Sequence, residues 1–108
     1  MPELSSPVKE FVEAVNAHDE ASFLEAFGDT GAVDDWGRQF VGTEEIKAWS
    51  DKEFLGARGK MDVQAVAEEA GRVILVADWH SNHANGLSQF TFDLDEDQIT
   101  KMTIRGAH

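Results

Sequence analysis

The sequence contains no cysteine and no tyrosine, and only two of its 108 residues are proline. The absence of cysteine excludes disulfides, thiolate metal ligands and a cysteine nucleophile. The longest aliphatic run, residues 73–77, is far shorter than the roughly 20 residues that a membrane-spanning helix needs. The opening Met1-Pro2-Glu3 has neither the basic nor the apolar part of a secretory leader. These absences predict a cytoplasmic protein.

Basic residues are also scarce, with nine Lys and Arg against 21 Asp and Glu and a formal net charge of −12. Nucleic acids and anionic membranes are bound by clustered basic side chains, and here the nine are scattered. The sequence therefore predicts neither a nucleic-acid partner nor a membrane partner. An apolar content of 42% indicates a folded core. The length predicts a single domain over residues 1–108.

Apolar residues recur at helical spacing in the first half of the chain and alternate in the second half. Helices are expected at about residues 7–16, 20–27 and 43–54. Strands are expected at about residues 32–36, 38–41, 61–68, 73–81, 89–94 and 99–105. Strand 73–81 is apolar on both faces, which predicts a central position in the sheet. In strand 61–68, alternation predicts four apolar residues on one face: Met61, Val63, Ala65 and Ala67. This order predicts an α+β domain with three helices packed on a curved sheet.

Four segments carry a family resemblance. They are Val15-Asn16-Ala17-His18-Asp19, then Phe27-Gly28-Asp29 before Ala32-Val33-Asp34-Asp35, then Gly37-Arg38-Gln39-Phe40-Val41-Gly42 before Thr43-Glu44-Glu45-Ile46, and finally Phe92-Asp93-Leu94-Asp95-Glu96-Asp97-Gln98-Ile99. Their order resembles the nuclear transport factor 2-like superfamily, and most closely its SnoaL-like (polyketide-cyclase-like) branch. The resemblance implies a cone-shaped fold with a strongly curved mixed β-sheet, one enclosed small-molecule pocket and a homodimer formed through the outer sheet face.

Asp34 and Asp35 are adjacent in a predicted strand, so their side chains point to opposite faces. The resemblance matches Asp35 with the base of ketosteroid isomerases, where a pocket carboxylate moves a proton between carbons. The alternative interpretation is that both residues are strand-end acids or turn caps. The oxyanion hole of those isomerases uses a Tyr and a protonated Asp. This chain has no tyrosine, and Phe90 stands near the position of that Asp, so steroid isomerisation is not expected.

Asp78 and His80 are two residues apart in a predicted strand, which puts them on the same face. If that face lines the pocket, they are candidates for an acid/base pair or for polar anchors of a ligand. If it faces solvent or a dimer partner, Leu75, Ala77 and Trp79 on the opposite face line the pocket instead. Alternation alone leaves both arrangements open.

Large apolar residues are numerous for so short a chain. The candidates for a pocket lining are Trp36, Trp49, Phe54, Phe90, Phe92 and Met102. As a set they favour a small apolar or amphipathic ligand, although each one alone is equally an ordinary core residue. Arg38 and Arg105 are candidates to bind a carboxylate or enolate oxygen, and the alternative is that they pair with acids of the chain itself.

The chain has no Gly-rich phosphate loop, no serine elbow and no nucleotide fingerprint, so no cofactor is expected. His80 and His83 lack a third ligand at metal-binding spacing, so no metal is expected. Three functional hypotheses follow. The first is a small-molecule binding domain, and the second is an isomerase, cyclase or hydrolase that uses Asp35 as general acid/base. The third is a structural dimerisation or interaction module whose cavity is filled by its own side chains.

Overall fold

The computed structural model describes residues 6–82, 85–96 and 98–106. In these ranges the helices are α1 (Ser6–Asn16), α2 (Glu20–Phe27) and α3 (Thr43–Glu53). The strands are β1 (Ala32–Asp35), β2 (Arg38–Val41), β3 (Lys60–Glu69), β4 (Arg72–His80), β5 (Gly86–Asp95) and β6 (Gln98–Gly106). The predicted order of helices and strands is confirmed. As expected, Asp19 caps α2 by accepting a hydrogen bond from the backbone N–H of Ser22 at 3.2 Å.

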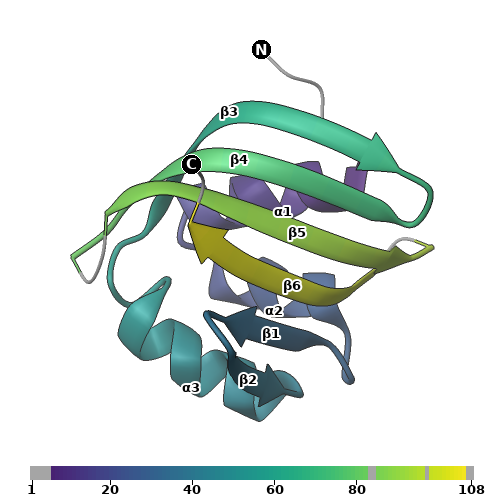
Figure 1. The fold of residues 1–108 in the computed structure, drawn as a ribbon. Coiled ribbons are helices and arrows are strands. Elements are labelled where there is room, and N and C mark those ends of the chain that lie inside the picture. The colour runs from purple at the N-terminus through teal and green to yellow at the C-terminus, as the bar shows by residue number, and fades with distance from the viewer. Residues whose placement is uncertain (1–5, 83–84, 97, 107–108) are drawn as a thin grey trace.

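The strands form one sheet in the order β2-β1-β6-β5-β4-β3. β1 pairs with β6 in parallel and the other neighbours are antiparallel, so the predicted mixed sheet is confirmed. Figure 1 shows a curved sheet with α1 and α2 packed behind it and α3 beside β1 and β2. We call the face toward the helices the inner face and the opposite one the outer face. None of the described helices is long and apolar enough to cross a membrane.

The expectation that residues 73–81 form a central strand, buried on both faces, is wrong. β4 lies between β5 and β3, next to one end of the sheet. Its residues alternate between buried and partly exposed, because the helices cover only the inner face. On the inner face of β4, the buried residues are Val73, Leu75, Ala77 and Trp79. The outer face of β4 therefore carries partly exposed apolar residues, Ile74 and Val76.

A β-bulge in β3 changes which of its residues face the core. The pairing register with β4 shifts between Val63 and Ala65. One extra residue in a strand reverses the alternation of side chains beyond it. Val66 therefore packs against the core, whereas Ala65 and Ala67 are exposed. The prediction that Met61, Val63, Ala65 and Ala67 share one face is thus wrong beyond Val63.

The core between the sheet and α1 and α2 is rich in phenylalanine. The ring of Phe11 lies 5.5 Å from that of Phe23, 5.6 Å from that of Phe27 and 5.2 Å from that of Phe92, measured between centroids. Edge and tilted contacts of this kind are favourable for aromatic rings. Met102 pairs with Phe92 in the sheet, and both are completely buried. This cluster fills the half of the inner face that the first two helices cover.

Two polar side chains at and just beyond the C-terminal end of α1 hold the start of β3 and the residue before it. The Asn16 side-chain amide donates to the carbonyl oxygen of Met61 at 3.1 Å, and its oxygen accepts from the backbone N–H of Met61 at 2.7 Å. Nε2 of His18 is hydrogen-bonded to the carbonyl oxygen of Gly59 at 3.0 Å. These contacts hold the loop between α3 and β3 close to the helices, and that loop borders the site described next.

Candidate functional site

A strained two-residue turn between β1 and β2 presents an exposed tryptophan. Trp36 and Gly37 both have positive φ, at 55° and 92°, as a type I′ hairpin turn requires. A bulky residue with positive φ is uncommon, and such strain concentrates at functional sites. The backbone N–H of Trp36 donates to the carbonyl oxygen of Ile104 at 3.3 Å, which ties the turn to β6. Trp36 is 64% exposed.

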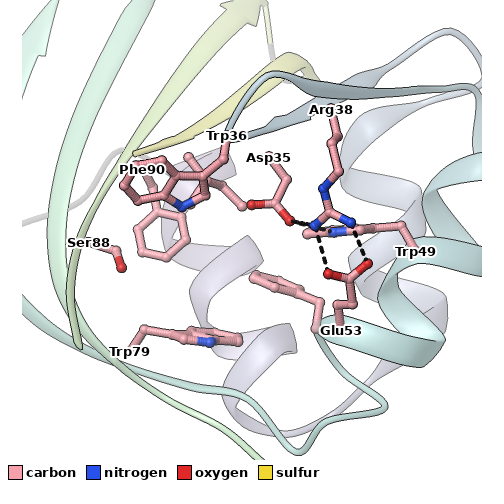
Figure 2. Close-up of a pocket in the computed structure, with 10 residues that line it drawn as sticks. Asp35, Trp36, Arg38, Trp49, Glu53, Trp79, Ser88 and Phe90 are labelled. Atoms are coloured by element: carbon pink, nitrogen blue, oxygen red, sulfur yellow. Dashed lines mark hydrogen bonds and ion pairs between the residues drawn. The ribbon is translucent and has the colours of Figure 1, made fainter. Parts of the chain in front are cut away.

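Beneath this turn lies an open pocket of about 160 Å³, bounded by α3 and the inner face of the sheet. The space is large enough to admit several waters. The cavity is therefore not filled by the side chains of the chain itself. Figure 2 shows the rings of Trp36 and Phe90 on one side of Asp35, with Arg38, Glu53 and Trp49 on the other.

Six of the residues predicted to form a site line this pocket: Asp35, Trp36, Arg38, Trp49, Phe54 and Phe90. Phe92 and Met102 do not line it. Both lie on the inner face, but they pack under α1 and α2 in the phenylalanine core. Alternation predicts the face on which a residue lies, but it carries no information about which part of that face the helices cover.

Three lining residues were not predicted from the sequence: Glu53, Ser88 and Ile104. Trp79 also lines the pocket, as the alternative arrangement of its strand predicted. Glu53 looks like an ordinary solvent-exposed acid at the end of a helix. Its place in the pocket results from how α3 packs against β2, which no local pattern indicates.

Stacked aromatic rings form one wall of the pocket. The ring of Phe54 stacks on Trp49 at 4.8 Å and on Trp79 at 4.5 Å, with interplanar angles of 25° and 10°. A glycine makes this arrangement possible, because a Cβ atom on Gly59 would lie 1.9 Å from Cη2 of Trp79. The three rings thus stack in a row with Phe54 in the middle.

The polar side of the pocket is a three-residue ion-pair cluster. Arg38 donates from Nη1 to Oε2 of Glu53 at 3.0 Å and from Nη2 to Oε1 at 2.7 Å. Its Nη2 also donates to Oδ2 of Asp35. The side chains of Asp35 and Glu53 are only 14% and 18% exposed, whereas that of Arg38 is 52% exposed. The hydrogen bonds to Glu53 and then to Asp35 raise the pKa of Arg38 further above its usual range.

Trp49 links the aromatic wall to this cluster. Its indole Nε1 donates to Oδ2 of Asp35 at 3.1 Å. Oδ2 therefore receives two hydrogen bonds, while Oδ1 of Asp35 receives none from the residues that the structure describes. For Arg38, the structure supports the alternative in which it pairs with carboxylates of the chain itself.

Asp34 lies on the outer face and stabilises the turn. Its Oδ1 accepts from the backbone N–H of Gly37 at 2.8 Å and from Nη1 of Arg105 at 3.0 Å. Nη2 of Arg105 donates to Oδ2 at 3.3 Å. The Arg105 guanidinium, and next the Gly37 N–H, hold the pKa of Asp34 below its ordinary value. Arg105 is thus paired with Asp34 and does not line the pocket.

Asp78 and His80 also lie on the outer face, away from the pocket, where Oδ2 of Asp78 and Nε2 of His80 are 3.2 Å apart. Both side chains are exposed, and Trp79 between them is the residue that reaches the pocket. The face that carries Asp78 and His80 therefore does not line the pocket. In the described part of the chain no group of three His, Asp or Glu is arranged to hold a metal ion, and His83 lies outside that part.

No protein-family model matches this sequence, and no curated protein matches it significantly. Solved structures match it over nearly its full length. An NTF2-like protein of unknown function from Cytophaga hutchinsonii is 18% identical with a TM-score of 0.81, over 96% of this chain and 91% of that one. A SnoaL-like protein of unknown function from Burkholderia thailandensis is 18% identical with a TM-score of 0.78, over 99% of this chain and 100% of that one.

A third similar structure contains a ligand. It is RV0760c from Mycobacterium tuberculosis in complex with estradiol-17beta-hemisuccinate, 18% identical with a TM-score of 0.78, over 94% of this chain and 92% of that one. At these identities the comparisons show a shared fold. This chain has the NTF2-like fold of the SnoaL-like proteins, as the resemblance in its sequence predicted.

Proposed function

We propose that this chain is a binding domain for a small molecule whose apolar part is the size of a single ring. The observation that carries the proposal is the open pocket of about 160 Å³ between the stacked aromatic wall and Asp35. Aromatic walls with a few placed polar groups are typical of small-molecule sites. The steroid derivative bound to the similar Mycobacterium tuberculosis protein supports a small-molecule role for this fold.

The volume limits the ligand. A dry cavity of about 150 Å³ in another protein binds benzene, whereas sites for drug-sized ligands measure about 300–1,000 Å³. A pocket of about 160 Å³ therefore encloses about one ring, and the rest of a larger ligand would lie outside it. Burying about 100–150 Å² of apolar ligand surface contributes about 3–4 kcal/mol, which corresponds to millimolar affinity before any polar contact is counted.

All three tryptophans of the chain line this pocket, so their indole N–H signals report directly on its occupancy. We expect single-ring compounds to shift these signals in a ¹⁵N-labelled sample, with saturation at millimolar concentration. Replacing Ser88 by Leu fills the cavity and should abolish the shifts. Thr91→Leu, on the outer face of the same strand, is the matched control and should leave them intact. If no single-ring compound shifts the signals, or if Ser88→Leu binds as well as the unchanged chain, the proposal fails.

A catalytic role of the same pocket is the second candidate, and the unused oxygen of Asp35 favours it. Oδ1 of Asp35 receives no hydrogen bond from the described residues, so it is placed to accept a proton from a bound molecule. In this candidate function Asp35 acts alone, since Asp78 and His80 lie on the other face. For any turnover found with a pocket ligand, Asp35→Asn should abolish it while Asp78→Asn leaves it unchanged. Turnover that survives Asp35→Asn would remove Asp35 from the reaction.

A further inference from the structure

Trp36 lines the pocket and is also exposed to solvent, so it stands at the rim. We propose that the ligand carries a second, flat group outside the pocket and that Trp36 binds this group by stacking. The inference rests on the proposed binding function, which concerns the ring inside the pocket. It adds the chemical class of the outer part of the ligand, which is a planar aromatic group.

The first argument is that Trp36 differs from the other aromatic residues of the pocket. Trp36 is 64% exposed, and the others are at most 7% exposed: Trp49, Phe54, Trp79 and Phe90. Those four pack on one another, with ring centroids between 4.5 and 6.2 Å apart. Within the described part of the chain, Trp36 has neither an aromatic contact nor a hydrogen-bond partner for its indole N–H. Its ring is therefore the one aromatic surface of the pocket that lacks an aromatic partner in the described residues.

The second argument is the backbone that carries Trp36. A turn of this type favours Asn, Asp or Gly at its first position, because φ is positive there, and the φ of Trp36 is 55°. Hydrogen bonds hold the turn in place, from the N–H of Trp36 to Ile104 at 3.3 Å and from the N–H of Gly37 to Asp34 at 2.8 Å. The chain thus holds a bulky residue at the rim against the local preference. Such departures are expected at functional sites.

The third argument is the size of the pocket. Its volume of about 160 Å³ encloses about one ring. A ligand that extends beyond this ring leaves through the mouth of the pocket, which the exposed Trp36 borders. Figure 2 shows Trp36 on the same side of Asp35 as Phe90, which is part of the aromatic lining. Because aromatic pairs gain from stacking in addition to the area that they bury, Trp36 suits a flat outer ring.

Two alcohols that differ by one fused ring test the inference: benzyl alcohol and naphthalenemethanol. Each is titrated while the indole N–H signals of Trp49 and Trp79, two buried residues of the pocket, are followed. We expect naphthalenemethanol to bind about tenfold more tightly, because its outer ring stacks on Trp36. Trp36→Ala should remove this gain and leave the affinity for benzyl alcohol nearly unchanged.

Matched variants separate stacking from other effects. Trp36→Phe keeps a flat ring and should retain most of the gain, whereas Trp36→Leu keeps only apolar bulk and should lose most of it. All three replacements keep a Cβ atom at the same positive φ, so any change in the turn affects them alike. Val41→Ala is the control, since Val41 is a 55% exposed residue of the same hairpin that does not line the pocket. It should change neither affinity, and equal gains in Trp36→Phe and Trp36→Leu would contradict stacking.

A second measurement uses the unchanged chain. A neutral gadolinium chelate in solution broadens the signals of the N–H groups that it can approach. It should broaden the Trp36 indole signal in the free chain and in the presence of benzyl alcohol, and saturating naphthalenemethanol should restore that signal. The Trp49 signal is the reference, because Trp49 is 3% exposed and its indole N–H is bonded to Asp35.

The outcomes separate the two proposals. If the gain for naphthalenemethanol is absent or survives Trp36→Ala, or if the Trp36 signal stays broadened in the saturated complex, the stacking inference is overturned and the binding function stands. A Trp36 signal that is protected before any ligand is added would show that a second copy of the chain or another segment covers the ring, which also overturns the inference. If neither alcohol shifts the Trp49 and Trp79 signals at millimolar concentration, both proposals are overturned.

Discussion

Asp34 and Asp35 are neighbours with different tasks, and the substitution Asp34→Asn separates them. Asp34 accepts two hydrogen bonds from Arg105 and one from the backbone of Gly37. An asparagine oxygen can keep the bond to Gly37, but it lacks the charge that Arg105 compensates. Asp35 keeps its contacts in the pocket. We therefore expect this substitution to act on stability.

The expected magnitude follows from exposure. Buried hydrogen bonds to charged groups contribute about 1.5–3 kcal/mol, and exposed ion pairs contribute about 0–1 kcal/mol. The Asp34 side chain is 11% exposed and that of Arg105 is 42% exposed, so the pair lies between these limits. We expect Asp34→Asn to lower the free energy of unfolding by about 1–2 kcal/mol at pH 7. For a domain of this length that loss lowers Tm by about 5–10 °C.

The pH dependence identifies charge as the cause. Because the folded-state pKa of Asp34 is lowered, its contribution is fully present above the unfolded value of about 3.9. The contribution is lost as pH falls through the lower folded-state value. The stability of the unchanged chain should therefore converge on that of Asp34→Asn in acid. Urea unfolding followed by circular dichroism from pH 7 down to about pH 2.5 measures this convergence.

Two results would refute this reasoning. Equal stability of Asp34→Asn and the unchanged chain at pH 7 would show that the ion pair contributes nothing. A difference that persists unchanged in acid would assign the loss to turn geometry rather than to charge. Arg105→Gln should reproduce the loss at pH 7, and the double variant should lose less than the sum of the two single variants.

Three further predictions test other features of the structure. Gly59→Ala should lower the free energy of unfolding by about 1–3 kcal/mol and move the Trp79 indole N–H signal, because the new Cβ meets that ring; an unchanged Tm would contradict the contact. At position 36 a glycine variant should be about 1 kcal/mol more stable than an alanine variant, since only glycine tolerates φ of +55° without cost. Urea unfolding compares the two variants directly, and equal stability would argue against the strained turn. The homodimer implied by the sequence resemblance stays a prediction. Sedimentation equilibrium should show a dimer, and Val76→Lys, on the partly exposed outer face, should convert it to a monomer. A monomeric unchanged chain would rule the dimer out.

The predicted elements match the structure closely where local chemistry is strong. Asp19 and Gly28 bound α2 at the expected positions, because a carboxylate caps the first turn and glycine adopts the positive φ of 69° at the end. The expected turn at Gly37 is also present, although the strand ends one residue earlier and Trp36 becomes part of the turn. Helix caps and turn residues act on the backbone of their immediate neighbours in the chain, so they need no tertiary contact.

The candidate site was predicted only in part, because local patterns do not show which part of a sheet face the helices cover. Large aromatic residues on the inner face were identified as a set, but Phe92 and Met102 became core while Phe90 became pocket. The difference is the cover provided by α1 and α2, which reach one half of the inner face. Glu53 was missed because its role depends on Arg38, fifteen residues away in the chain and brought to it by the packing of α3 against β2.

By itself the sequence determined the number and order of helices and strands, the acidic surface and the opposed directions of Asp34 and Asp35, because periodicity and capping depend on neighbours in the chain. Only the tertiary structure decided which of the two faces is inner, and with it that Asp35 reaches the pocket while Asp34 and Asp78 remain outside. The residues of a strand determine which side chains share a face. Which of the two faces is buried depends on the face against which the helices pack.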